Sequence, residues 1–324
     1  MRAARRNGTG TQPLETHAEF ALPAGAVPST LDGSEPVVRM AYRVGDAPCE
    51  RPRLSGAFSG SGGIAISVAA RVDLHDLDVD RHLHDPNLKQ RYVTTLFDTI
   101  APKYDRFTHW FSFGLDRGWK RELTGFVRDV VPRGGLVLDL ACGTGDLTSG
   151  VLDGPVGGSV GAPRLVGLDP SGEMLTRARA RLNTPRTGVV RLLRGDMMSI
   201  PLADGSADVV MVGYGLRNVP DYRVALREIT RVLKPGGWLI SLDFFLPRRP
   251  MWRRVFLTYL RVAGRFYGWW FHREPAAYGY IAESIAGWVM QGEFDETLLG
   301  AGFGTLVTRS RLGGGVCIHA GSRG

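Results

Sequence analysis

Cysteine is scarce in this sequence, because Cys49, Cys142 and Cys317 are the only ones in 324 residues. Three scattered cysteines exclude a disulfide framework and a cysteine zinc site. The seven histidines show no pair at the spacing that places two imidazoles on one helix face. We therefore expect a protein of a reducing compartment that binds no metal, in which Cys142 is a small packing residue.

Long apolar runs are also absent. No stretch approaches the roughly 20 residues with which a helix crosses a bilayer. Arg2, Arg5 and Arg6 resemble the start of a signal or transit peptide, but no apolar segment follows them. We expect a cytoplasmic protein that is at most peripheral on the inner face of a membrane.

The composition divides the chain near residue 84. Residues 1–84 are rich in Gly, Pro, Ser and Ala and show neither helical nor strand periodicity, which predicts a low-complexity, disordered extension. Residues 85–324 carry the periodic apolar segments of a folded domain. Within this domain, residues 248–290 are expected to form a helical lid and substrate region.

Apolar runs alternate with amphipathic segments along this domain. Strands are predicted at 136–140, 165–168, 189–193, 207–212 and 238–244, and helices at 174–182 and 221–233. Asp221 is expected to cap the second helix, and Pro235-Gly236-Gly237 to end it. The alternation is typical of a Rossmann-like, doubly wound α/β sheet, in which ligands bind outside the carboxyl ends of the parallel strands.

A glycine turn follows the first of these strands. Gly143 and Gly145 have no Cβ, so the backbone can pass close to a ligand at the start of the next helix. Asp169 ends the second strand, where its carboxylate can accept hydrogen bonds from two ribose hydroxyls. Asp196, or the backbone of Met197, can hold an adenine amino group after the third strand. These features predict a nucleoside-binding crevice.

Two cofactors, NAD and S-adenosylmethionine, are alternatives for this crevice. The NAD fingerprint has a third glycine where this sequence has Thr148, and it places a pyrophosphate at the helix N-terminus, where Asp146 would repel it. S-adenosylmethionine has no phosphate and carries a positive sulfonium, with which Asp139 and Asp146 are compatible. The residues favour the methyl donor; a glycine turn without a ligand is the remaining alternative.

Six further segments form a more specific pattern. They are residues 97–105 (FDTIAPKYD), 112–115 (SFGL), 119–121 (WKR), 215–219 (GLRNV), 231–237 (RVLKPGG) and 280–285 (YIAESI). This pattern resembles the ubiquinone and menaquinone C-methyltransferase family from about Arg91 to the C-terminus. Three positions depart from it: Thr108 replaces a usual Asn, Asp116 a usual His, and Gly213 a frequent serine.

The resemblance implies a class I methyltransferase fold with S-adenosylmethionine as the methyl donor. Thr144, Asp169, Asp196 and Met197 would be cofactor contacts by position, together with Asp139, Gly143 and Gly145 of the glycine-turn region. The implied reaction is methylation of a ring carbon on a polyprenylated hydroquinone. We expect the conversion of demethylmenaquinol to menaquinol, with methylation of a 2-methoxy-6-polyprenyl-1,4-benzoquinol in the ubiquinone pathway as the alternative.

The chemistry of carbon methylation indicates candidate catalytic residues. An aromatic carbon becomes a good nucleophile when a neighbouring phenol loses its proton, and the carbon must then be aligned with the sulfur–methyl bond. Our hypothesis is that Arg217 stabilises the phenolate, directly or through a water, while Asn218 and Tyr104 orient the ring oxygens. The alternatives are a salt-bridging Arg217 and a Tyr104 that only packs beneath a lid.

Residues 248–273 combine arginines with aromatic residues and contain no acidic residue. The arginines are Arg248, Arg249, Arg253, Arg254, Arg261, Arg265 and Arg273, and the aromatic residues are Trp252, Phe256, Tyr259, Phe266, Tyr267, Trp269, Trp270 and Phe271. Such a segment is typical of a helix at an anionic membrane surface, which would suit a substrate with an isoprenoid tail. An ordinary inserted helix with a solvated basic face is the alternative.

Other partners and functions follow from the same features. The net charge of +8 comes without a nucleic-acid motif, so we expect no nucleic-acid partner. The oligomeric state stays open, with a homodimer as one alternative. The fold would also suit an N- or O-methyltransferase of lipids or small molecules, or a non-catalytic quinone- or membrane-binding protein.

Overall fold

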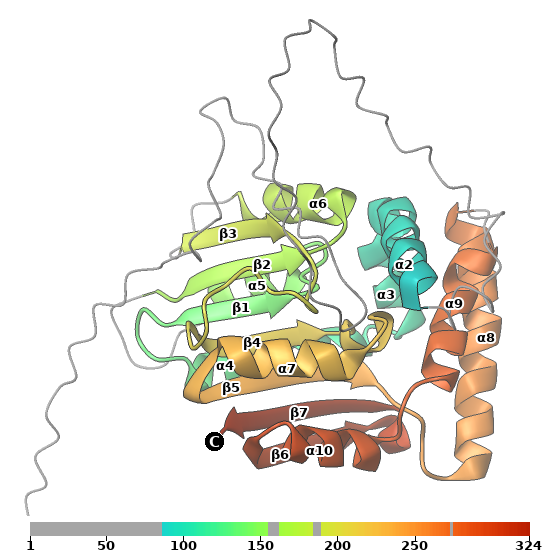
Figure 1. The fold of residues 1–324 in the computed structure, drawn as a ribbon. Coiled ribbons are helices and arrows are strands. Elements are labelled where there is room, and N and C mark those ends of the chain that lie inside the picture. Colours follow the sequence, from blue (N-terminus) through green and yellow to red (C-terminus); the bar gives the residue numbers. More distant parts are fainter. Residues whose placement is uncertain (1–85, 155–161, 184–188, 273–274) are drawn as a thin grey trace, which may run out of the picture.

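The computed structural model describes residues 86–154, 162–183, 189–272 and 275–324 (Figure 1). The extension predicted at residues 1–84 lies outside these residues. In the part of the chain that is described, no helix is both long and apolar enough to cross a membrane. The same residues contain no group of three or more potential metal ligands from His, Cys, Asp and Glu.

Seven strands form one twisted sheet in the order β3-β2-β1-β4-β5-β7-β6. The strands are β1 (Leu136–Leu140), β2 (Arg164–Asp169), β3 (Val189–Arg194), β4 (Ala207–Gly213), β5 (Leu233–Phe244), β6 (Phe303–Arg311) and β7 (Val316–Arg323). The first five are parallel, and β7 runs antiparallel to both β5 and β6. The order reverses between β1 and β4, which opens the crevice expected of a doubly wound sheet at their carboxyl ends.

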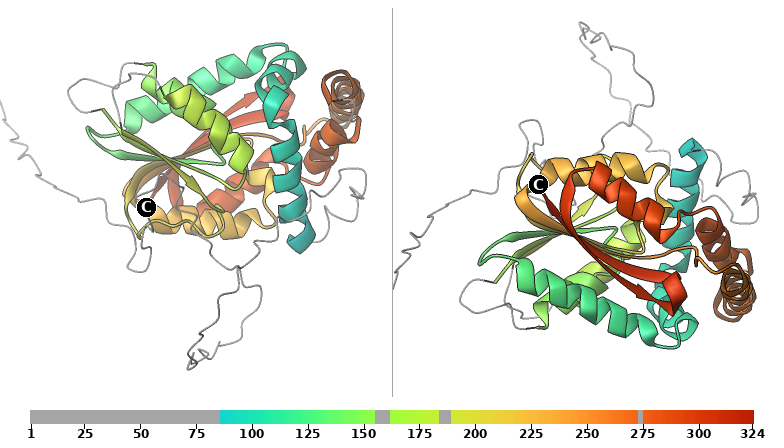
Figure 2. Two further views of the ribbon diagram at one scale, coloured as in Figure 1. Left: turned by 90° about the horizontal axis from the view of Figure 1, so that it is seen from above. Right: turned by 90° about the horizontal axis from the view of Figure 1, so that it is seen from below.

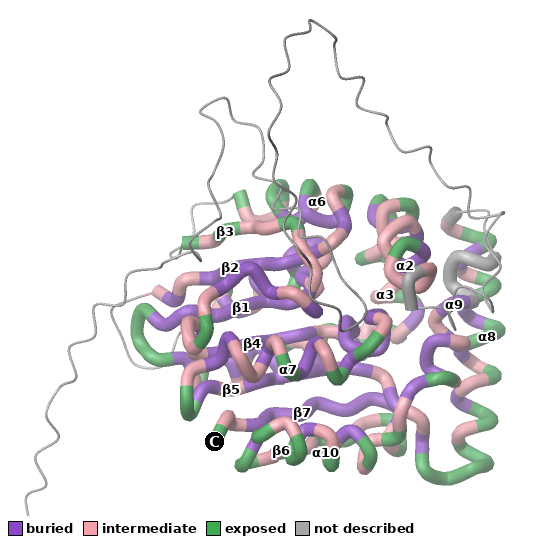
Figure 3. Tube along the Cα trace, viewed as in Figure 1, coloured by how far each residue is buried: buried purple, intermediate pink, exposed green. Residues whose placement is uncertain are grey.

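Helices cover both faces of the sheet (Figure 2). One face carries α4 (Leu115–Val130), α5 (Asp146–Leu152) and α6 (Gly172–Leu182), and the other carries α7 (Tyr222–Val232) and α10 (Gln291–Gly300). Every residue of β1 is buried between these layers, as Figure 3 shows, which explains its uninterrupted apolar sequence apart from Asp139. The predicted Rossmann-like α/β fold is therefore confirmed.

A group of helices, the helical end layer, lies beyond the carboxyl ends of the parallel strands (Figure 1). It comprises α2 (Pro86–Ile100), η2 (Ala101–Lys103), α3 (Tyr104–Phe111), α8 (Pro250–His272) and α9 (Pro275–Ala286). These helices share an apolar cluster of their own, in which Leu96, Phe107, Leu260 and Tyr280 are almost fully buried. The segment predicted as a helical lid thus forms α8 and α9, and the N-terminal helices α2 and α3 complete the same layer.

The predicted boundaries differ from the structure where local hydrogen bonds extend an element. Helix α6 begins at Gly172 because the Ser171 hydroxyl accepts a hydrogen bond from the Met174 amide. Asp221 caps α7, as predicted. Strand β5 begins at Leu233, before the glycines, because Leu233 pairs with Ala207 and a register shift then accommodates the turn. Strands β6 and β7 were not among the predicted elements.

Candidate functional site

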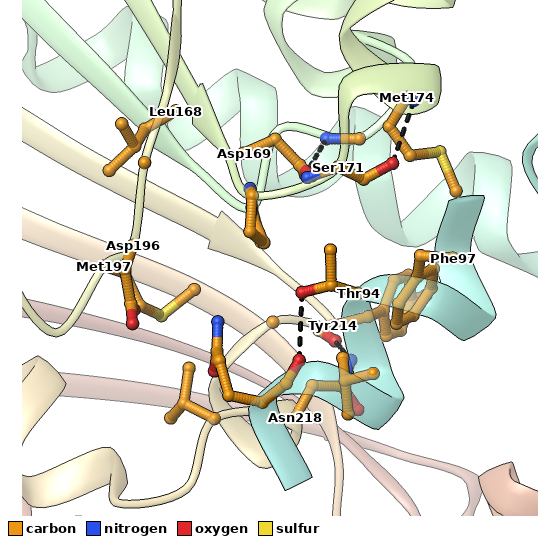
Figure 4. Close-up of a pocket in the computed structure, with 18 of the residues that line it drawn as sticks. Thr94, Phe97, Leu168, Asp169, Ser171, Met174, Asp196, Met197, Tyr214 and Asn218 are labelled. Carbon is orange, nitrogen blue, oxygen red and sulfur yellow. Dashed lines mark hydrogen bonds between the residues drawn. The ribbon is translucent and has the colours of Figure 1, made fainter. Parts of the chain in front are cut away.

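The carboxyl ends of β1, β2, β3 and β4 surround a cavity of about 670 Å³ that is open to solvent. This cavity, which we call the nucleoside cavity, is covered by α2 through Gln90, Val93, Thr94 and Phe97. Figure 4 shows Asp169 and Asp196 projecting from two strand ends while Thr94 and Phe97 form the wall on the α2 side.

The glycine turn forms the floor of the nucleoside cavity. Ala141, Gly143 and Gly145 have φ angles of +52°, +54° and +77°, so the chain turns through the left-handed region three times. Ala141 and Gly143 line the cavity. Gly145 does not, because it packs against α6: a Cβ there would lie 3.1 Å from Cδ1 of Leu182. Of the two predicted glycine contacts, only Gly143 therefore faces the cofactor site.

Asp169 lies in the wall of the nucleoside cavity, where the sequence predicted a ribose ligand. One carboxylate oxygen accepts a hydrogen bond from the Gly143 amide at 2.8 Å, and the other accepts one from the Ser171 amide at 2.8 Å. Burial raises the pKa of Asp169 to about 6, against these two stabilising hydrogen bonds. The carboxylate is thus fixed in orientation and keeps lone pairs for further donors.

Asp139 and Thr144 lie beside the nucleoside cavity rather than in its wall. Asp139 is fully buried and accepts a 2.7 Å hydrogen bond from the Thr148 hydroxyl, and burial raises the pKa of Asp139 to about 7. The Thr144 hydroxyl donates to Asp105 at 2.8 Å and accepts from Arg181 at 3.0 Å. Both residues therefore stabilise the turn, and their assignment as cofactor contacts stays a prediction.

Asp196 and Met197 follow β3 and line the nucleoside cavity on the side away from α2 (Figure 4). A carboxylate oxygen of Asp196 accepts a 2.8 Å hydrogen bond from the Met198 amide, which fixes the side chain. Burial raises the pKa of Asp196. This position suits the predicted contact with an adenine amino group.

A second cavity of about 560 Å³ adjoins the first, and we call it the ring cavity. Phe97, Tyr104 and Tyr214 line both cavities, so the two meet at these three aromatic residues. The remaining wall of the ring cavity is mainly apolar and includes Phe107 and Phe111. A planar aromatic substrate would fit such a wall, with its reacting atom facing the nucleoside cavity.

Two of the three predicted catalytic residues line different cavities. Arg217 and Asn218 are neighbours in the 3-10 helix η3 (Leu216–Asn218), which follows β4. Arg217 lines the ring cavity and Asn218 the nucleoside cavity, whereas Tyr104 lines both. Burial raises the pKa of Tyr104, so its hydroxyl is neutral and can donate a hydrogen bond.

Arg217 forms a buried ion pair with Asp243 at the end of β5, with 2.6 Å between Nη1 and Oδ1. Burial opposes the charge of Arg217, but Asp243 raises the pKa of Arg217, so it remains a cation. Its Nε is buried without a hydrogen-bond partner among the described residues, as is the hydroxyl of Tyr214. Arg217 is thus ion-paired, as the salt-bridge alternative expected. Its Nε–H group is also a donor that the described residues leave unused beside the ring cavity, as the catalytic hypothesis requires.

The ring cavity also contains a carboxylate, Asp116, which in the sequence is only a departure from the family pattern. Asp116, near the start of α4, is buried and lines this cavity. Its carboxylate accepts hydrogen bonds from the Ser112 hydroxyl at 2.8 Å and from Nζ of Lys120 at 3.1 Å. Lys120 also pairs with Asp146 at 2.8 Å. Asp116 stands four residues before Lys120, a spacing that predicts an ion pair on a helix. No sequence pattern predicts that Asp116 lines a cavity.

The basic, aromatic segment forms α8, and its exposed face combines both residue types. Phe266, Trp269 and Trp270 are exposed, and so are Arg254 and Arg265. Arg261 pairs with Glu283 of α9 at 3.0 Å. Arg273 lies outside the described residues. The helix therefore packs by one face on the helical end layer and presents cations and rings on the other.

Several known proteins are similar to this chain. A model of the ubiE/COQ5 methyltransferase family matches residues 86–323. A demethylmenaquinone methyltransferase of Listeria welshimeri is 36% identical over 235 residues, which are 72% of this chain and 96% of that protein. One of Staphylococcus haemolyticus is 34% identical over 237 residues, 72% and 95% of the two chains. A solved SAM-dependent methyltransferase structure from Thermotoga maritima aligns over 72% of this chain and 100% of its own, with 20% identity and a TM-score of 0.47.

Proposed function

Because this chain belongs to the ubiE/COQ5 methyltransferase family and is an S-adenosylmethionine-dependent methyltransferase, we propose that it methylates a ring carbon of demethylmenaquinol. The observation that carries this proposal is the meeting of the nucleoside and ring cavities at Phe97, Tyr104 and Tyr214. A donor in one cavity and an aromatic acceptor in the other would face each other across these residues. Such alignment is what an in-line displacement requires.

The nucleoside cavity fits S-adenosylmethionine by the chemistry of its wall. The fixed carboxylate of Asp169 accepts from ribose hydroxyls, and Asp196 with Met197 receives the adenine. The aromatic faces of Tyr104 and Tyr214 stabilise a cation at the junction with the ring cavity. When bound, the cofactor supplies an electrophilic methyl group on a positive sulfur.

In the ring cavity, the protein controls the proton of the substrate hydroxyl. Asp116 accepts the phenolic proton, which raises the nucleophilicity of the neighbouring ring carbon. Arg217 stabilises the negative charge on the oxygen, and Asn218 and Tyr104 orient the ring oxygens. The ring carbon would receive the methyl group that the cofactor supplies, and the sulfur would keep the electrons of the broken bond. The ring hydrogen would leave as a proton to solvent, and Asp116 would return the phenolic proton to the oxygen, which restores the aromatic hydroquinol.

The exposed face of α8 supports a peripheral contact with an anionic membrane. Arg254 and Arg265 would meet lipid head groups, while Phe266, Trp269 and Trp270 enter the boundary of the acyl chains. Replacement of both tryptophans by alanine should release the protein from vesicles that contain anionic lipid, in a sedimentation assay. Unchanged sedimentation of this variant would contradict the membrane contact.

The direct test of the reaction uses labelled S-adenosylmethionine with two acceptors in detergent micelles. One acceptor is reduced demethylmenaquinol, and the other is the benzoquinol precursor of the ubiquinone pathway. Mass spectrometry should detect one labelled methyl group on demethylmenaquinol. Transfer only to the benzoquinol would move the assignment to that pathway. Absence of transfer to either, with cofactor binding intact, would overturn the quinol assignment.

A further inference from the structure

A third cavity, of about 810 Å³, continues from the ring cavity toward the surface. The two cavities share Phe111, Ser112 and Phe244. The walls of the third cavity come from the turn between α3 and α4, from one side of α8, and from the 3-10 helix η4 (Leu312–Gly314) before β7. Three cavities therefore follow one another from the cofactor site to the outside.

The lining of the third cavity is apolar, apart from Ser112. Its two large amphipathic side chains direct their polar atoms to the backbone: Tyr259 donates to the Phe111 carbonyl at 2.6 Å, and Trp252 donates to the Leu312 carbonyl at 2.7 Å. These hydrogen bonds also tie α8 to the α3–α4 turn and to η4. The remaining surface of the cavity offers no charged group to a ligand.

The lining changes from buried to exposed along the cavity. Phe111, Phe256 and Leu260 are nearly inaccessible at the inner end, whereas Val255 is 52% exposed and Phe113 is 75% exposed at the outer end. Phe113 nevertheless stacks on Tyr259, with 5.8 Å between the ring centroids. Leu115, Trp252 and Leu312 are also exposed and line the same cavity, so its mouth is an exposed apolar patch, which indicates a surface that an apolar ligand covers.

Backbone strain marks the same cavities independently. Among the described residues, four other than glycine have positive φ: Phe113 at +52°, Ala141 at +52°, Tyr214 at +59° and Leu312 at +48°. Ala141 and Tyr214 line the nucleoside cavity, and Phe113 and Leu312 line the third cavity. Such conformations concentrate at ligand sites, where the surrounding structure maintains them. The third cavity thus shares this feature with the cofactor site.

We propose that the third cavity is a tail groove, which binds the first isoprene units of the substrate's polyprenyl chain. The occupant follows from continuity: the ring cavity and the third cavity share Phe111 and Phe244, so a chain attached to a ring in the ring cavity reaches the surface past them by an apolar route. The groove opens beside α8, whose exposed rings and cations suit a membrane surface. This inference rests on the proposed quinol substrate.

The test compares acceptors that differ only in tail length, all below the micellar concentration of detergent. Reduced demethylnaphthoquinols with no tail and with one to four isoprene units are assayed with labelled S-adenosylmethionine. For the wild-type enzyme, kcat/KM should rise by roughly tenfold or more over the first units, because apolar carbons leave water, and then level off. The rise should be in KM rather than in kcat.

Two variants of α8 separate the groove from the general surface. Val255 lines the groove, whereas Val262, two turns further along α8 and 64% exposed, does not. Val255→Lys should remove the dependence on tail length and leave turnover of the tail-less acceptor unchanged. Val262→Lys should keep the wild-type dependence. Leu115→Lys, on the opposite wall of the groove, should reproduce the effect of Val255→Lys.

The test separates failure of the tail groove from failure of the proposed function. Absence of methyl transfer to every acceptor would overturn the quinol substrate itself. Transfer to all acceptors with equal kcat/KM, or equal behaviour of the two valine variants, would overturn the tail groove alone. A change in oligomeric state of Val255→Lys in sedimentation, with an unchanged tail dependence, would assign the groove to a second copy of the chain instead.

Discussion

Replacement of Asp116 by asparagine tests whether this carboxylate accepts the phenolic proton. Asparagine has the same size, and its amide oxygen can still accept hydrogen bonds from Ser112 or Lys120. Lys120 also keeps its 2.8 Å ion pair with Asp146. The fold and the affinity for S-adenosylmethionine should therefore persist, while the ring cavity loses its base.

The expected loss depends on pH. A positioned general base contributes about 10²- to 10⁴-fold. A phenol with a pKa of about 10 is already ionised to about one part in a thousand at pH 7, and this fraction limits the variant. We expect kcat of Asp116→Asn to fall by roughly 10²- to 10³-fold at pH 7 and to recover by about tenfold for each pH unit, as the substrate ionises in solution.

Initial rates of labelled methyl transfer from about pH 6.5 to about pH 9.5 provide the measurement. Asp146→Asn is the matched control, because it removes the other partner of Lys120 and does not line the ring cavity. Any loss in this control should be the same at every pH. If kcat of Asp116→Asn falls by the same factor at every pH, proton transfer to Asp116 is refuted. Asp116 would then serve only to position Lys120.

Three further predictions concern the cofactor site, the glycine turn and the buried ion pair. Since burial raises the pKa of Asp169 to about 6 and only the carboxylate accepts two ribose hydroxyls, calorimetry should show weaker S-adenosylmethionine binding as the pH falls through about 6. Asp169→Asn should bind S-adenosylmethionine weakly at every pH. A wild-type Kd that does not change with pH would contradict the ribose contact. Gly145→Ala should lower the free energy of unfolding in urea by about 1–3 kcal/mol, because φ is +77° and its Cβ would press on Leu182; Gly205→Ala, with φ +58° and open space around it, should cost only about 1 kcal/mol. Arg217→Met should destabilise the fold by about 3–5 kcal/mol by leaving Asp243 unpaired, and adding Asp243→Leu should restore stability without restoring methyl transfer. Restored transfer in the double variant would reduce Arg217 to a structural role.

Local sequence patterns were sufficient for the five parallel strands of the sheet and for part of the site. The run 136–140 is β1, because a strand covered on both faces needs apolar residues without interruption. The acidic residues that end β2 and follow β3 were predicted to lie in the wall of the cofactor site, because the carboxyl ends of parallel strands meet at one edge of the sheet. These predictions depend on residues that are close in sequence.

Contacts between residues far apart in the sequence determine the parts of the site that local patterns did not predict. Thr144 turns away from the cavity because Asp105 and Arg181, each more than 30 positions away, form hydrogen bonds with its hydroxyl. Asp116 lies in the ring cavity only because the start of α4 meets α3, β5 and α9 there. The tail groove likewise combines the α3–α4 turn with η4, about 200 residues later, and no periodicity within either segment predicts that.

The position of β7 has a consequence for the order in which the protein can be completed. Strand β7 lies between β5 and β6 in the sheet, although it is made after both. During synthesis, β6 has no neighbour to pair with until β7 has emerged, and β5 presents an open edge over the same interval. Nascent chains that stall or are truncated before residue 316 would therefore expose two unpaired strand edges. Such fragments should be prone to aggregation and recognised by chaperones, even though every residue of the cofactor cavity has already been synthesised.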